Sequence, residues 1–195
     1  INYKIFPSVI NSNERMTYTN VNKILEGDEK VQKRYPYLLD MCIQMKVLSD
    51  IIRRRREKLG AIDFDTREAK ILVDEKGKPK DIVLRERKDA ERMIEDFMIA
   101  ANETVATHAK WMEIPSMYRV HEQPEPKKIR EFARVAKVLG YTFQGGIQNV
   151  YPMQLQSLLK EAKGQDNYFV LSSFMLRSMQ KARYDNRCLG HFGLL

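Results

Sequence analysis

The hydrophobic period of the chain changes at Gly60, and this change most restricts the folds that the chain can adopt. From Pro36 to Lys58, apolar residues recur at three- and four-residue steps, which predicts a long amphipathic helix. The residues of this stripe are Leu38, Met41, Cys42, Met45, Leu48 and Ile52. Beyond Gly60, the segment AKILVDEKGKPKDIVLRER predicts two strands around a Lys-Gly-Lys-Pro turn, hence a β-hairpin. A helix followed by an antiparallel hairpin indicates the α+β class.

The rest of the chain is predicted to be mostly helical, with one further strand at Tyr3–Ile10. A short helix is expected in ERMTYTNVNKILEG, with Thr17 or Thr19 as N-cap and Gly27 as C-cap. Asp89 is the predicted N-cap of a helix that runs to about Trp111. Three more helices are predicted at 127–139, 152–163 and 167–184, with Gly140 and Gly164 as stop signals.

Composition favours a basic globular chain with a polyanionic partner. The 195 residues carry 34 Lys and Arg against 26 Asp and Glu, a net charge of +8, and 43% of the residues are hydrophobic. This balance suits a folded chain that meets its partner electrostatically. No apolar run approaches the roughly 20 residues of a membrane helix, and the first residues do not resemble a signal peptide. Two distant cysteines, Cys42 and Cys188, indicate a reducing cytoplasm.

The helix predicted to end near Trp111 carries two polar residues on an otherwise apolar sector. Glu95 and Asn102 lie seven residues apart, nearly in line, beside Met98 and Ile99. A separate sector holds Arg92, Asp96, Glu103 and Thr107, and it is expected to face solvent. Glu95 is expected either to be bound structurally, by a backbone amide or an arginine, or to face a polar cleft.

Two other groups combine positive charge with helical spacing. Four consecutive arginines, Arg53 to Arg56, end the long helix, where they favour the helix dipole and are candidates for phosphate contacts. In FMLRSMQKARYD, the residues Arg177, Lys181 and Tyr184 are four and three residues apart. On a helix they would form a basic and aromatic stripe that tracks a nucleic-acid backbone, or they would serve only in ion pairing and packing.

Phe64, in the short extended segment AIDFD, is either a core residue or a stacking platform for a base, and the sequence alone favours the core. The sequence contains no nucleophilic triad, no phosphate-binding glycine loop and no metal-like spacing of its three histidines. The residues themselves therefore indicate a basic α+β chain able to bind RNA or DNA, without a visible catalytic centre.

Several segments, in this order along nearly the whole chain, resemble the catalytic (RNB) domain of the ribonuclease II family, and within it the ribonuclease R branch. They are RMTYTNVNKIL, GAIDFD, ERMIEDFMIAANETVA, MYRVHE, REFARVAKVLGY, FVLSSFMLRSMQKARYD and LGHFGL. Two positions depart from the family pattern, since Asp96 stands where many relatives have Glu and Leu195 where a small residue is common.

The resemblance implies a processive 3′-to-5′ exoribonuclease that hydrolyses RNA to 5′-nucleoside monophosphates. By this resemblance Glu95 contacts the 3′-terminal nucleotide and Phe64 is one aromatic of a base clamp. Arg177, from the basic and aromatic stripe, is also predicted to bind substrate. Asn102, Lys181 and Tyr184 are secondary candidates for substrate contacts. The implied cofactor is Mg²⁺, held by an aspartate cluster that the resemblance places upstream of Ile1, so no metal ligand is expected in this chain.

The chain, residues 1–195, is accordingly expected to be an internal part of one catalytic domain, without the family's cold-shock and S1 domains, and inactive by itself. The expected partner of the intact monomeric enzyme is the 3′ end of single-stranded RNA, with no membrane involved. The alternatives are a non-catalytic RNA-binding module or regulator of the same fold and, ranked third, an adaptor that uses its basic patch for a protein partner.

Overall fold

The computed structural model describes residues 2–64 and 68–193 and has the mixed helical and antiparallel architecture predicted from the sequence. The elements in chain order are α1 (Tyr18–Glu26), α2 (Glu29–Arg34), the 3-10 turn η1 (Pro36–Leu38), α3 (Leu39–Lys58), β1 (Glu68–Val73), β2 (Pro79–Arg85), α4 (Asp89–Trp111), β3 (Tyr118–Val120), α5 (Pro126–Val138), α6 (Pro152–Ala162), α7 (Tyr168–Ser178) and β4 (Arg183–Asp185). Among the described residues, no helix combines the length and the apolar composition needed to cross a bilayer.

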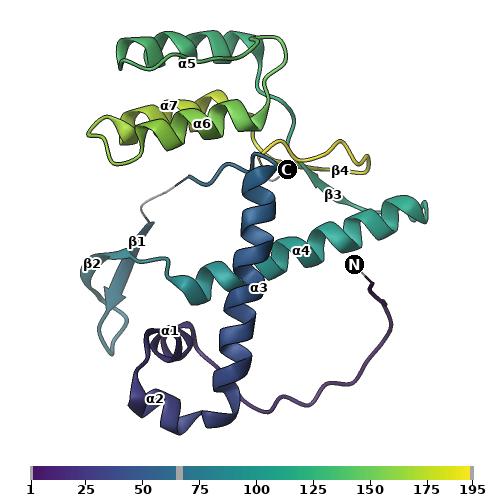
Figure 1. Cartoon of the computed structure of the whole chain (residues 1–195), viewed down its shortest axis with the longest axis vertical. Coiled ribbons are helices and arrows are strands. Elements are labelled where there is room, and N and C mark those ends of the chain that lie inside the picture. The colour runs from purple at the N-terminus through teal and green to yellow at the C-terminus, as the bar shows by residue number, and fades with distance from the viewer. Residues whose placement is uncertain (1, 65–67, 194–195) are drawn as a thin grey trace.

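Helix α3 connects two separate hydrophobic clusters. Figure 1 shows α4 crossing α3, with α1 and α2 near one end of α3 and the unit of α5, α6 and α7 beyond the other end. The smaller cluster joins α1, α3 and α4 through residues that include Ile24, Cys42 and Met93, which are at most 2% exposed. Along the predicted stripe of α3, Leu38 and Cys42 are buried, whereas Met41 and Leu48 are each 49% exposed.

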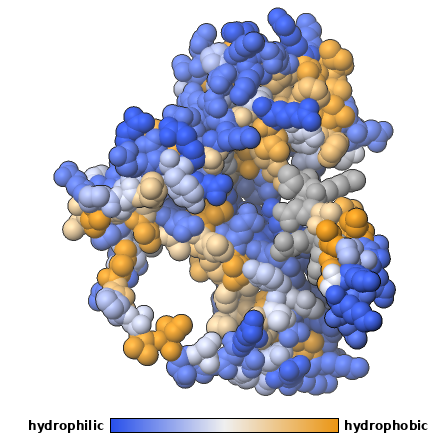
Figure 2. Space-filling model, turned by 180° about the vertical axis from the view of Figure 1, so that it is seen from behind, coloured by the Kyte–Doolittle hydropathy of each residue, from blue (hydrophilic) through white to orange (hydrophobic). Residues whose placement is uncertain are grey.

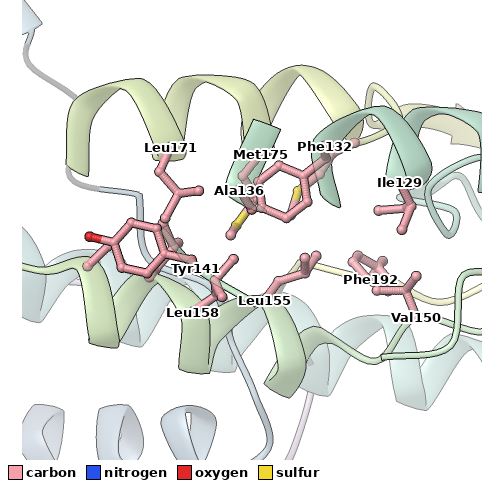
Figure 3. Close-up of a cluster of buried hydrophobic side chains, with 13 residues drawn as sticks. Ile129, Phe132, Ala136, Tyr141, Val150, Leu155, Leu158, Leu171, Met175 and Phe192 are labelled. Atoms are coloured by element: carbon pink, nitrogen blue, oxygen red, sulfur yellow. The ribbon is translucent and has the colours of Figure 1, made fainter. Parts of the chain in front are cut away.

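The larger cluster fills the space between α5, α6 and α7. Ile129, Phe132, Leu155, Leu171 and Met175 are all at most 1% exposed. Figure 3 shows these side chains pointing toward one another from the three helices. Each of these large apolar side chains contributes about 1.5–3 kcal/mol on burial, so the cluster stabilises the packing of the three helices.

The hairpin is confirmed, with β1 antiparallel to β2 and Ile71 opposite Ile82. A second antiparallel pair, which the sequence patterns did not predict, joins β3 to β4 and sets Arg119 opposite Tyr184. Each strand of this pair spans only three residues, too few for a period-2 pattern to stand out in the sequence.

Some predicted element ends are confirmed and others are wrong. Thr17 is the N-cap of α1, with its side chain accepting a hydrogen bond from the Asn20 amide at 3.2 Å, and Gly27 ends this helix at φ 89°. Asp89 is not the N-cap of α4. Asn22 of α1 supplies that contact instead, since its Oδ1 accepts from the Ala90 amide at 2.8 Å.

Two predicted elements differ from the structure. Residues 2–17 form no strand, and Phe6, Val9 and Ile10 are more than half exposed, because no described segment pairs with this part of the chain. The helix predicted at 167–184 ends at Ser178, and its last residues become β4. The short helix α2 was also missed, since six residues are too few to show a helical period.

Candidate nucleic-acid interface

Two neighbouring carboxylates of α4 lie in opposite environments. Asp96 is 2% exposed and accepts hydrogen bonds from Ser49 Oγ at 2.8 Å, Arg53 Nη2 at 2.7 Å and Arg56 Nη1 at 3.0 Å. The prediction that Asp96 faces solvent is therefore wrong. The structural role that was considered for Glu95, a buried carboxylate held by arginine, belongs to Asp96, because α3 packs on that side of α4.

Glu95 faces the open side of α4. Its side chain is 45% exposed, and Glu95 Oε2 lies 3.7 Å from Arg87 Nη1, whose side chain is 41% exposed. An exposed ion pair of this length contributes little to stability, about 0–1 kcal/mol. Glu95 is thus not sealed in the core, and its carboxylate is accessible to a ligand.

Arg87, in the loop between β2 and α4, joins Glu95 to the segment that contains Phe64. Arg87 Nη2 donates to Asp63 Oδ1 at 3.1 Å and to Asp63 Oδ2 at 3.0 Å. Since Asp63 directly precedes Phe64, the arginine holds the AIDF segment close to the exposed side of α4. Two residues 31 positions apart in the sequence, Phe64 and Glu95, therefore belong to adjoining segments.

Phe64 itself is half-buried and packs against the α5–α7 cluster. Its contact with the core agrees with the interpretation that the sequence favoured. Part of the ring stays exposed, and the stacking of a base on Phe64 stays a prediction.

The AIDF segment is positioned by the junction between α3 and α6. Gly60 adopts φ 95°, a left-handed conformation that ends α3, and a Cβ at this position would approach the Met153 amide nitrogen to 2.8 Å. Gln156 of α6, which is 8% exposed, donates to the carbonyl oxygens of Glu57 at 3.0 Å and Ala61 at 2.8 Å. These contacts fix the direction in which the chain leaves α3.

The four arginines at the end of α3 divide into two pairs. Arg53 and Arg56 bind the buried Asp96, whereas Arg54 and Arg55 are exposed. The four arginines therefore do not share one face of α3. Arg54 and Arg55 remain candidates for phosphate contacts.

The predicted stripe of Arg177, Lys181 and Tyr184 does not exist as a helical stripe, because α7 ends at Ser178. Arg177 is exposed on α7, with Cζ 6.0 Å from the centre of the Phe174 ring. Lys181 lies in the connection after the helix, and Tyr184 is 68% exposed on β4. Asn102 is exposed on α4, two turns beyond Glu95. The substrate roles of all these residues stay predictions.

Strand β4 also carries a carboxylate with two arginine partners. The side chain of Asp185 is 7% exposed and is bound by Arg183 and Arg187, the latter with Nε at 3.1 Å. Hydrogen bonds from the Arg187 side chain and amide, together with Arg183, hold the pKa of Asp185 well below its usual range. The charge of Asp185 therefore persists, and the cluster braces the turn after β4.

A pair of histidines was missed by sequence reasoning, which treated the three histidines only as metal candidates. His121 and His191 form an isolated parallel bridge, and their ring centres are 5.1 Å apart. His121 Nε2 lies 2.9 Å from the carbonyl oxygen of Gln180, while His191 Nδ1 is buried without a hydrogen-bond partner among the described residues. Burial, with smaller effects of His121 and Arg119, lowers the pKa of His191 to about 4.

The predicted site residues form no metal-binding group among the described residues, and they do not line the pocket described below. Within residues 2–64 and 68–193, no group of three or more His, Cys, Asp or Glu side chains could hold a metal ion. A pocket of about 500 Å³ opens beside the start of α6. It is lined by Thr142, Gln144, Tyr151, Met153, Gln154, Ser157, Leu158 and Glu161, none of which is a predicted site residue.

Sequence comparison identifies the family of the chain. A model of the RNB domain matches residues 1–195. The chain belongs to the RNB-domain family. Ribonuclease R 1 of Lactococcus lactis is 46% identical over 194 residues, which cover 100% of this chain and 24% of that protein. Ribonuclease R of Thermotoga maritima is 39% identical over 100% of this chain and 27% of its own length. The chain thus spans about a quarter of the length of these relatives.

Solved structures of the RNB-domain family confirm the α+β fold. The structure of Mycoplasma genitalium RNase R in complex with ribose methylated single-stranded RNA has a TM-score of 0.81 and 32% identity, covering 91% of this chain and 28% of that one. The structure of the same enzyme in complex with double-stranded RNA also has a TM-score of 0.81, with 33% identity over 91% of this chain and 31% of that one. The resemblance seen in the sequence motifs is therefore confirmed.

Proposed function

We propose that the protein containing this RNB-domain chain is a processive 3′-to-5′ exoribonuclease. Water attacks the terminal phosphodiester, the bond from phosphorus to the 3′ oxygen breaks, and a 5′-nucleoside monophosphate leaves. Similarity to ribonuclease R along the whole of this chain supports this assignment. The observation that carries it to particular residues is the link through Arg87, which holds the Phe64 segment beside the accessible Glu95.

In this proposal Glu95 accepts hydrogen bonds from the 3′-terminal nucleotide, and Phe64 stacks on a base. Arg177 contacts the RNA, with Asn102, Lys181 and Tyr184 as secondary contacts. Correct placement of the terminal nucleotide keeps the scissile phosphate in register, which is the main contribution that such positioning residues make to the rate.

The described residues do not fit a magnesium site, because no cluster of suitable ligands is present among them. In this proposal the Mg²⁺ ligands that the RNB-domain family implies lie on residues of the protein outside this chain. We also assign this chain to a single catalytic domain, with cold-shock and S1 domains elsewhere in the protein. We propose that the protein is a monomer and acts on single-stranded 3′ ends. We also propose that it works in the cytoplasm, because Cys42 and Cys188 are free thiols, as expected in a reducing compartment.

The test uses the whole protein and a single-stranded RNA labelled at every internal phosphate, so that released mononucleotides and the final product are both detected. Glu95→Ala is expected to slow release of mononucleotides by about 10–100-fold, since hydrogen bonds to a charged group contribute about 1.5–3 kcal/mol. The thermal midpoint should stay close to that of the parent, because Glu95 is exposed. Glu103→Ala, at another exposed carboxylate of α4, is the matched control and should leave the rate unchanged.

Phe64→Ala is the second test and should lengthen the final product. Loss of base stacking removes about 1–3 kcal/mol of binding free energy per base, so the shortened RNA dissociates before its last few nucleotides are cleaved. Equal rates for parent and Glu95→Ala, with unchanged products from Phe64→Ala, would refute the assigned site. Absence of mononucleotide release from the whole protein, in the presence of magnesium, would refute the proposed activity itself.

The isolated 195-residue chain provides a complementary test. We expect weak, sequence-independent RNA binding whose affinity falls with salt, with a log–log slope of about −0.7 per neutralised phosphate. We expect no release of mononucleotides from this chain alone, even with magnesium. Robust hydrolysis by a preparation free of the whole protein would show that the metal ligands lie within this chain.

A further inference from the structure

Helix α5 carries a line of four cations that the site around Glu95 does not use. Lys127, Arg130, Arg134 and Lys137 are all exposed. Their spacing of three, four and three residues places them within a sector of about 80°, at about 100° per residue. The line extends for about 15 Å along the axis, at a rise of about 1.5 Å per residue. These four residues are called the α5 cationic face.

Packing fixes the orientation of the α5 cationic face. On the opposite side of α5, Ile129, Phe132 and Ala136 are at most 1% exposed and are part of the α5–α7 cluster. The helix cannot rotate without exposing these apolar side chains to water. The four charges are therefore presented to solvent on a rigid support.

The charges of this face are not neutralised within the described part of the chain. None of the four side chains forms an ion pair with a described residue, whereas the neighbouring Lys128 lies 3.9 Å from Glu125. One carboxylate, Glu131, is exposed near the same sector, so the face keeps a net charge of about +3. Such a concentration of like charge favours an anionic partner.

The α5 cationic face lies away from Glu95. In Figure 1, α5 lies at the outer edge of the molecule, with α6 and α7 between it and the crossing of α3 and α4. Figure 2 shows hydrophilic side chains over most of this end of the molecule. An anion bound here would therefore be a different part of a long polyanion from the part that reaches Glu95.

We propose that the α5 cationic face binds the phosphodiester backbone of RNA outside the segment that is being cleaved, an inference that rests on the proposed nuclease function. The face has no aromatic side chain and only one exposed apolar residue, Val138, so it lacks the anchors on which a protein partner would pack. Interfaces with nucleic acid are more positively charged than those between proteins. Without aromatic platforms the contact is to phosphates and is independent of sequence.

The test compares two four-site variants of the whole protein. The first is K127Q/R130Q/R134Q/K137Q. The second is the charge-matched control K76Q/K78Q/K80Q/K110Q, whose four lysines are exposed on the β1–β2 hairpin and at the end of α4. Affinity is measured across a salt series for a single-stranded RNA of several dozen nucleotides, and cleavage is measured on an oligoribonucleotide too short to reach α5. Circular dichroism verifies that each variant retains its helices.

For the first variant, we expect the salt slope on the long RNA to become shallower by about 2–3, at about 0.7 per lost phosphate contact, with at least about tenfold weaker binding at low salt. Cleavage of the short RNA should equal that of the parent, and the control variant should keep the parent's slope. The R130K/R134K variant keeps the charge and should keep the affinity. Equal salt slopes for parent and first variant, or equal losses in first variant and control, would overturn the proposal.

These measurements distinguish a failure of the α5 proposal from a failure of the proposed nuclease function. If the whole protein releases no mononucleotides but the first variant still shows the shallower salt slope, then the nuclease assignment fails and RNA binding by α5 stands. If mononucleotides are released and the salt slope does not change, the nuclease assignment stands and the role of α5 is refuted.

Discussion

The α3–α4 crossing and the α5–α7 unit are held together by different kinds of contact. Across the crossing, the buried residues of α3 are only Cys42 and Ser49, and the central contact is the carboxylate of Asp96 with its arginine partners. In the α5–α7 unit, the interior is an apolar cluster in which Phe132 and Leu155 are at most 1% exposed.

This difference suggests that the two regions serve different purposes. The apolar cluster fixes which side of each helix faces the interior, whereas the three directional hydrogen bonds to Asp96 also fix where the polar groups of α3 and α4 meet. With α4 fixed in this way, the preceding residue, Glu95, is directed to the accessible side. We infer that the polar crossing orients the candidate site and that the apolar unit supports both Phe64 and the α5 cationic face.

Asp96→Ala in the whole protein is expected to have the largest effect on the crossing, about 3–5 kcal/mol of its local opening free energy. Arg53, Arg56 and the Ser49 hydroxyl would lose their shared acceptor while remaining partly buried. Hydrogen exchange of the α3 and α4 amides measures this change. The control Glu103→Ala should stay within about 0.5 kcal/mol. Parent-like exchange in Asp96→Ala would mean that packing alone holds the crossing.

Leu155→Ala tests the other side of the comparison and should cost about 3 kcal/mol, because the side chain is fully buried and leaves a cavity. Hydrogen exchange should accelerate in α5, α6 and α7 but not in α4. The control Leu176→Ala, at a leucine of α7 that is 48% exposed, should change exchange much less. If α4 loosened as much as α6 in Leu155→Ala, the two regions would be one cooperative unit and the comparison would fail.

The same contrast explains which parts of the structure the sequence could predict. The apolar residues of α5 and α6 follow a helical period, so their helices were predicted to within one residue. The hairpin was predicted from its turn residues and its change of period. The Asn22 cap of α4 was not predictable in this way, because the contact spans 68 residues and depends on how α1 packs.

Prediction of the site was more limited for a related physical reason. A helical wheel orders residues around an axis but does not show which side a neighbouring helix covers. Asp96 was therefore assigned to solvent, and Glu95 was considered for burial. In the structure α3 covers the side of α4 that carries Asp96 and leaves Glu95 exposed. The stripe from Arg177 to Tyr184 failed because β4 forms by pairing with β3, a partner 65 positions away from Tyr184 at Arg119. Arg87, which links Asp63 to Glu95, had no signal in the pattern at all.

The His121–His191 pair lies at the edge of the apolar unit, beside the buried Phe192, and should make that edge sensitive to pH. The pKa of His191 is lowered to about 4 in the folded chain, below its ordinary value of about 6.5, chiefly by burial. Between these values the unfolded chain binds a proton that the folded chain does not. Stability is therefore complete above about pH 6.5 and falls as the pH decreases toward about 4.

We expect a loss of about 1–2 kcal/mol over this window, after allowing for solvent screening of a partly exposed ring. The measurement is the urea midpoint of the whole protein at about pH 5 and about pH 7, compared between parent and His191→Gln. The variant, which cannot titrate at this position, should show the smaller difference between the two midpoints. An equal difference in both proteins would assign the pH dependence to other groups.

Ser49→Ala is expected to cost about 1–2 kcal/mol, and it tests whether the crossing is a single hydrogen-bonded unit. Ser49 is 1% exposed and donates to Asp96 at 2.8 Å, so its removal weakens the cluster but leaves both arginine contacts. Ser157→Ala, at an exposed helical serine, should be nearly neutral. In the Asp96→Ala background, the Ser49 hydroxyl has already lost its acceptor. Adding Ser49→Ala should therefore leave hydrogen exchange the same as in Asp96→Ala alone. Fully additive costs would mean that Ser49 acts through helix packing, and the role of the polar crossing in orienting Glu95 would then rest on the two arginines only.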